Sequence, residues 1–93
     1  MKPRDSDTAV IKVLYFARLR EAFDCAEESL VLPEGVADVA GLGALLRQRG
    51  GAWASELGEG RAVRAAVNQD MADPSTPIAD GDEVAFFPPV TGG

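Results

Sequence analysis

Residues 10–19 read VIKVLYFARL, and this stretch decides the fold that the sequence predicts. It is dense in Val, Ile, Tyr and Phe, the β-branched and aromatic residues that favour a strand in the middle of a sheet. Because side chains alternate along a strand, Val13 and Tyr15 should face one side of the sheet and Leu14 and Phe16 the other. We expect a central strand here, preceded by a flexible polar leader at residues 1–8.

The segments that follow predict a second strand and then a helix. The charged stretch REAFDCAEE, residues 20–28, should be a connection, and SLVLPEG, residues 29–35, should begin with a strand that forms a hairpin with the first. Asp38 is a plausible N-cap for a helix that Gly50 and Gly51 would end. The apolar face of this helix is formed at spacings of three and four by Val39, Leu42, Leu45 and Leu46.

The remaining segments predict the other strands of one sheet. RAVRAAVNQ, residues 61–69, resembles a strand with Val63 and Val67 as apolar anchors, and a short strand could follow at Met71. A turn at residues 80–82 should lead into a last strand, EVAFFPP. Strands around one helix indicate an α+β domain over residues 9–89, with a mixed sheet of four or five strands packed on one main helix.

Charge and hydropathy exclude two classes of partner. Nine Lys and Arg residues against fifteen Asp and Glu residues give a net charge of −6, the wrong sign for binding a nucleic-acid backbone. No apolar run is long enough for a membrane span or a signal peptide, so we expect no membrane association and a cytoplasmic protein. An acidic surface instead favours basic patches on other proteins.

Few side chains in this sequence could act as catalytic groups or metal ligands. The chain has one cysteine, Cys25, and no histidine, so a disulfide, a metal site and a Ser/His or Cys/His nucleophile pair are all unsupported. A [2Fe–2S] centre, which needs four cysteine ligands, is excluded for the same reason. We expect no bound cofactor, and any reaction must be unusual or shared with another chain.

The last residues form a distinctive carboxyl-terminal segment. Pro88 and Pro89 donate no backbone hydrogen bond, so they should end sheet pairing and project residues 90–93, VTGG, as a flexible tail. Gly92 and Gly93 lack a Cβ, which would let the walls of a narrow active site close around the backbone. A terminal Gly-Gly alone is commonly a frayed end, but here it follows an apolar strand directly.

Three segments together resemble a known family, the small, sulfur-carrying subunits of molybdopterin synthase. They are VLYFARLRE at residues 13–21, AAVNQ at residues 65–69 and DGDEVAFFPPVTGG at residues 80–93. The resemblance implies the β-grasp fold of ubiquitin. It also implies that a ubiquitin-activating-type enzyme uses ATP to adenylate the terminal carboxylate, that a sulfur donor protein converts it to a thiocarboxylate, and that the sulfur passes to cyclic pyranopterin monophosphate.

The resemblance also implies roles for individual residues. Gly93 would carry the thiocarboxylate and Gly92 would thread beside it. The expected surface for the large synthase subunit, or for the activating enzyme, contains Phe16, Arg20, Met71, Phe87, Pro88, Pro89, Val90 and Thr91. Two such small subunits would serve a dimer of large ones in a heterotetramer, and the small subunit would not be catalytic alone.

Two other functions remain open on the sequence. A ubiquitin-like protein modifier, or a sulfur carrier for thiazole synthesis or tRNA thiolation, would share the fold and the Gly-Gly end. A binding module without chemistry at its end is the third alternative. Lysine conjugates, copurification with a pterin-binding chain and the mass of the carboxyl terminus would distinguish them.

Overall fold

Eight elements make up the computed structural model, which describes residues 9–58 and 60–89. The strands are β1 (Ala9–Tyr15), β2 (Glu27–Leu32), β3 (Arg64–Val67), β4 (Asp70–Ala72) and β5 (Glu83–Phe87). The helices are α1 (Ala17–Phe23), α2 (Val39–Arg47) and α3 (Gly51–Glu56). Within these residues, no helix has the length and apolar character needed to cross a bilayer.

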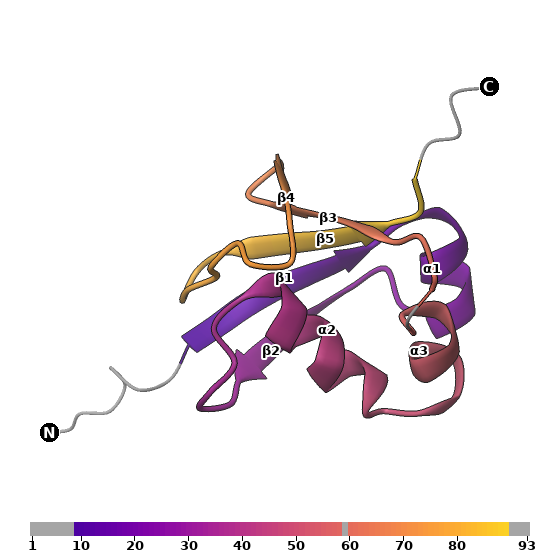
Figure 1. The fold of residues 1–93 in the computed structure, drawn as a ribbon, viewed down its shortest axis with the longest axis horizontal. Helices are drawn as coiled ribbons and strands as arrows, with labels where there is room; N and C mark the ends of the chain where they lie inside the picture. The colour runs from indigo at the N-terminus through magenta and orange to yellow at the C-terminus, as the bar shows by residue number, and fades with distance from the viewer. Residues whose placement is uncertain (1–8, 59, 90–93) are drawn as a thin grey trace, which may run out of the picture.

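The five strands form one mixed sheet in the order β2-β1-β5-β3-β4. β1 pairs antiparallel with β2 and parallel with β5, so the first and last strands lie side by side inside the sheet. β3 pairs antiparallel with both β5 and β4. Figure 1 shows α2 and α3 on one side of this sheet and the opposite side without a helix over it. The predicted α+β class and the mixed sheet, including the short strand at Met71, are confirmed.

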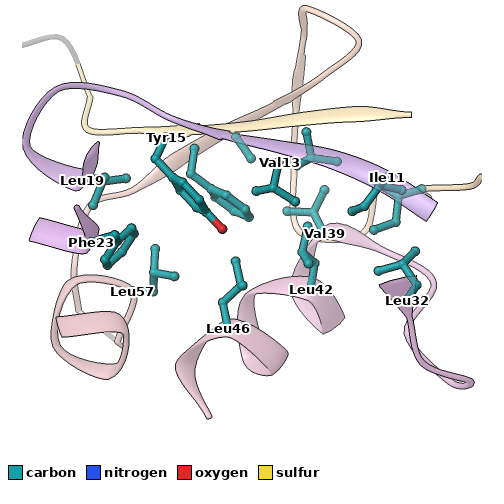
Figure 2. Close-up of a cluster of buried hydrophobic side chains, with 14 residues drawn as sticks. Ile11, Val13, Tyr15, Leu19, Phe23, Leu32, Val39, Leu42, Leu46 and Leu57 are labelled. Carbon is teal, nitrogen blue, oxygen red and sulfur yellow. The ribbon is translucent and has the colours of Figure 1, made fainter. Parts of the chain in front are cut away.

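The core lies between the sheet and the helices. Ile11, Val13 and Tyr15 alternate along β1 with more exposed residues and are 0–2% exposed, which confirms the predicted inward face. In Figure 2, Leu42 and Leu46 point from α2 toward the side chains of β1, and neither is exposed at all. Burial of large side chains such as these stabilises the fold by roughly 1.5–3 kcal/mol each.

The prediction for residues 16–28 was wrong. The first strand ends at Tyr15, and helix α1 replaces the end of the expected strand and the beginning of the expected connection, while β2 begins at Glu27, before the connection was expected to end. Its first residue, Ala17, has φ of 56°, and its N-cap residue, Phe16, makes no side-chain capping bond. Helix α1 therefore lacks the usual start signals, although the spacing of its two buried residues, Leu19 and Phe23, fits a helix.

Two smaller expectations also need correction. Gly50 and Gly51 do not simply end the main helix, because Gly50 is the N-cap of α3 and Gly51 is its first residue. Val63 lies before β3, and Ala65 is the buried core residue of the strand, while Val63 and Val67 are half-buried and pack against the core as predicted. Asp38, in contrast, caps α2 as predicted, since its Oδ1 accepts a hydrogen bond of 2.8 Å from the amide of Gly41.

The two glycines within α2 differ in the space around them, and this difference gives a stability prediction. A Cβ at Gly43 would have one neighbour, the Arg47 Nη1 at 3.6 Å, whereas a Cβ at Gly41 would lie 3.2 Å from the Asp38 Oδ1 that caps the helix. Gly43→Ala should therefore raise the free energy of unfolding by about 0.5–1 kcal/mol. Gly41→Ala should give no gain; an equal gain from both in urea denaturation would contradict this account.

A polar cluster that the sequence did not reveal joins β1, β2 and the end of α2. The Tyr15 hydroxyl donates to Glu28 Oε2 at 2.7 Å, and the Arg49 guanidinium donates to both Glu28 oxygens at 2.8 and 3.0 Å. Arg49 also lies 4.4 Å over the ring of Trp53, which stacks on Phe23 at 3.8 Å. Glu28, in the stretch expected to be a charged connection, therefore connects several elements.

Because of this cluster, the free energy of unfolding should depend on pH in the acidic range. Hydrogen bonds from Arg49 lower the pKa of Glu28 in the folded protein. The contribution of the carboxylate is thus complete above the unfolded value of about 4.3 and is lost as the pH falls through the folded value. Glu28→Gln should cost roughly 1–2 kcal/mol at pH 7 and flatten the fall in stability below pH 5. Urea titrations at several pH values measure both effects, and parallel curves for the two proteins would contradict the assignment.

Candidate functional site

The sheet face that lies opposite the core carries a row of apolar side chains. The strand registers place Leu14 beside Ala85, Ala85 beside Ala66, and Ala66 beside Met71, so the row crosses four strands. Their neighbours in sequence, among them Val13, Val84 and Ala65, belong to the core, so the row faces outward. We call this row, together with Phe87 two residues beyond Ala85, the sheet face.

Several side chains of the sheet face and its border are open to solvent. Met71 is 66% exposed and Phe16 is 45% exposed, two of only a few large apolar side chains so exposed in the described part of the chain. The amide of Phe16 donates to the carbonyl of Phe86 at 3.1 Å, so Phe16 lies at the end of β5 next to Phe87. Exposed apolar patches of this kind mark interaction surfaces.

The other predicted site residues do not belong to the sheet face. Arg20 is exposed on α1, a helix that contacts β5, so it lies beside the sheet face and not on it. Pro88 and Pro89 are half-buried and follow β5 outside any strand, as their missing donors require. Val90, Thr91, Gly92 and Gly93 lie outside the described residues.

Charged residues flank the apolar row. Lys12 and Glu83 face each other across β1 and β5, and Lys12 pairs with Glu27 at 3.9 Å. At the other end Arg64 lies opposite Phe87. An apolar centre with a charged border is the usual anatomy of a protein–protein interface. The sequence had indicated Phe16, Met71 and Phe87, but not Leu14, Ala66 and Ala85, which only the strand registers bring into line.

The described side chains form no reactive centre. They contain no group of three or more residues suited to hold a metal ion. Cys25 is half-buried, and burial raises the pKa of its thiol, with Glu28 adding to the effect. The thiol is therefore neutral and a poor nucleophile near pH 7. The sheet face is therefore a docking surface and not a reactive centre. It ends where β5 leads into the carboxyl-terminal segment.

Comparison with known proteins gives consistent results. The ThiS family model matches residues 13–93. The molybdopterin synthase sulfur carrier subunit of Escherichia coli is 43% identical over 86 residues, which cover 90% of this chain and 100% of that protein. A putative molybdopterin converting factor subunit 1 from Pyrococcus furiosus superimposes with a TM-score of 0.73 at 33% identity, covering 88% of this chain and 99% of that one. SAMP1 from Haloferax volcanii, a small archaeal modifier protein, gives 0.74 at 27% identity, covering 91% and 100%.

Proposed function

This chain belongs to the ThiS family, and from that membership we propose that it is the sulfur carrier subunit of a molybdopterin synthase. The observation that carries the proposal is the 43% identity that extends over the whole length of the Escherichia coli sulfur carrier subunit. The β-grasp sheet supports the same role. In this role the domain is the scaffold and the reactive group is at the carboxyl terminus.

The reactive group is the carboxylate of Gly93. Attack of a carboxylate oxygen on ATP forms an acyl-adenylate and releases pyrophosphate. The outer sulfur of a persulfide on the sulfur donor protein then displaces AMP, and a thiol cleaves the S–S bond of the resulting acyl disulfide, which leaves the thiocarboxylate and a disulfide between the thiol and the donor. The activating enzyme supplies both the ATP site and the catalysis, so this chain needs no bound cofactor. Sulfur makes the terminus a soft nucleophile, which attacks cyclic pyranopterin monophosphate during formation of the dithiolene.

The sheet face docks the large synthase subunit. Met71, Phe87 and Phe16 supply the apolar contact, and Arg20 supplies a charge at its edge. Docking holds residues 90–93 at the entrance of the partner's active site, which converts a bimolecular attack into an effectively unimolecular one. Two small subunits and two large ones would form the complete enzyme, and the reaction would take place in the cytoplasm.

Intact mass spectrometry tests the proposal. The chain is expressed in cells with the activating pathway and in cells without the adenylating enzyme, with the Escherichia coli subunit as a control in both. A species with one oxygen replaced by sulfur should appear only in the first cells. Absence of that species in cells that convert the control subunit would overturn the proposal.

A protein modifier is the second candidate, because the likeness to SAMP1 has a TM-score of 0.74. A modifier would form an isopeptide bond between Gly93 and lysines of other proteins. Tryptic peptides with a Gly-Gly remnant on lysine would support this candidate, whereas stoichiometric copurification with a larger pterin-binding chain would support the synthase.

A further inference from the structure

Two arginine side chains in the described part of the chain have no carboxylate or carbonyl partner there. The other basic residues of that part do have one: Arg47 donates to the carbonyl of Leu57, and glutamates pair with Lys12, Arg18, Arg49 and Arg61. Those without one are Arg20 and Arg64. Both lie on elements next to the carboxyl-terminal end of β5, because Arg20 is on α1, which contacts β5, and Arg64 pairs in register with Phe87, the last residue of that strand.

Arg64 faces the outer side of the sheet. Ala65 and Phe86, which pair with each other across β3 and β5, belong to the core. Because successive side chains of a strand point to opposite faces, Arg64 and Ala66 point away from the core, toward the sheet face. Arg64 is exposed there, whereas the residue that follows it in β3 is buried. The charge of Arg64 therefore lies on the sheet face and not beneath the helices.

Arg64 lies between two of the side chains on which the proposed docking depends. β3 runs between β5 and β4 in the sheet. On β5, Phe87 is directly opposite Arg64, and on β4, Met71 is its diagonal neighbour, because Met71 pairs with Ala66. Opposite side chains on one face are about 4.5–5.5 Å apart at their Cβ atoms, and diagonal ones are about 7–8 Å apart. A partner that covers both Phe87 and Met71 therefore covers Arg64 as well.

A guanidinium in that place needs an acceptor once it is covered. Loss of its water is costly unless hydrogen-bond acceptors replace that water. The acidic residue that the β3–β4 register brings next to Arg64 is Asp73, the first residue after β4. Its Oδ1 instead accepts hydrogen bonds from the amide and hydroxyl of Ser75 and from the hydroxyl of Thr76. The described part of this chain thus supplies no counterion for Arg64, and the acceptor has to come from the partner.

We propose that the large synthase subunit places the carboxylate of an aspartate or glutamate on Arg64, between Phe87 and Met71, and that Arg64 thereby determines which large subunits this chain accepts. The planar guanidinium suits this role because it donates two parallel hydrogen bonds to one carboxylate. A large subunit without an acidic side chain at this point would bury the charge uncompensated and would be rejected. The identity of the partner rests on the proposed function, whereas the need for an acidic group rests on the position of Arg64.

Surface plasmon resonance with the large subunit of the same organism tests the proposal. Arg64→Leu should weaken binding roughly thirtyfold or more, chiefly through faster dissociation, because it leaves the carboxylate of the large subunit buried without a partner. Arg64→Lys keeps the charge without the two parallel donors and should weaken binding less. Arg61→Leu is the matched control. It makes the same change in net charge at a residue that lies before β3 and pairs with Glu56, and it should change the affinity by no more than about twofold.

The sign of the Arg64→Leu effect decides the outcome. If Arg64 meets only apolar groups of the large subunit, the leucine variant should bind equally well or more tightly, and that result overturns the proposal. Slower association alone, equal for Arg64→Leu and Arg61→Leu, would show a solvated charge that only steers the encounter and would overturn it too. Urea denaturation checks that the variants fold, and Arg64→Gln replaces the leucine variant in the test if leucine unfolds the chain.

The same measurements separate this inference from the proposed function. If the unchanged chain binds the large subunit and Arg64→Leu binds it equally well, only the inference fails. If the unchanged chain does not bind the large subunit, the proposed function fails, and the partner named here fails with it.

Discussion

A chain without Gly93 is expected to fold with unchanged stability and to give no molybdopterin in a reconstituted reaction. The deletion moves the terminal carboxyl group back by one residue, about 3.5 Å of extended chain. A misplacement of about 1 Å at a reacting centre already costs roughly a hundredfold in rate. In the part of the chain that the structure describes, the core residues lie between Ile11 and Phe86, so we expect the deletion to leave the core intact. Product formation and urea denaturation of the same sample measure the two halves of this prediction.

The control is a truncation at the other end of the chain. Removal of residues 1–8 should leave product formation within about twofold of the full chain, because such terminal segments usually tolerate change. Undiminished product from the chain without Gly93 would rule out the terminal carboxylate as the sulfur-carrying group. Loss of product together with loss of folding would instead show that the deletion acts on the domain.

Replacement of Met71 by glutamate is expected to break the complex with the large subunit. Met71 is 66% exposed in the isolated chain and lies at the end of the apolar row on the sheet face. In the complex a glutamate there would be a buried charge without a partner, a change that costs roughly 3–5 kcal/mol. We therefore expect binding to weaken at least about a hundredfold. Isothermal titration calorimetry with the large subunit measures the change.

Val31→Glu is the matched control for this variant. Val31 on β2 is 58% exposed and pairs with Val10, and β2 forms the opposite edge of the sheet from the strand of Met71. The same acidic side chain there should change the affinity by no more than about twofold, because surface substitutions outside an interface have small effects. Equal affinities for Met71→Glu and the unchanged chain would place the docking surface elsewhere.

The parts of the fold that the sequence predicted are those with local signals. β1 and β5 are rich in β-branched and aromatic residues, and α2 has both an apolar period and the Asp38 cap. Helix α1 was missed because its first residue has a positive φ and no side chain caps it. The one sequence feature that indicated helix α1 was the spacing of Leu19 and Phe23. We missed it because residues 20–28 were interpreted as a charged connection.

The candidate site was predictable only in part, for a related reason. Phe16, Met71 and Phe87 came from the family resemblance, which locates single positions. The alignment of Leu14, Ala85 and Ala66 depends on strand registers between segments far apart in the sequence. The same holds for Glu28, whose partners Tyr15 and Arg49 are 13 and 21 residues away. Composition and periodicity carry no information about such pairings.

The parallel pairing of β1 with β5 has a consequence for synthesis on the ribosome. β5 contributes Val84 and Phe86 to the core and separates β1 from β3, so the sheet cannot close before residue 87 has emerged. Contacts between such distant segments form late and slowly. A nascent chain that stops short of β5 is left with an open core, and the cell's proteases can remove it. The domain can therefore complete its core only after β5 has been translated, which precedes any reaction at the carboxyl terminus.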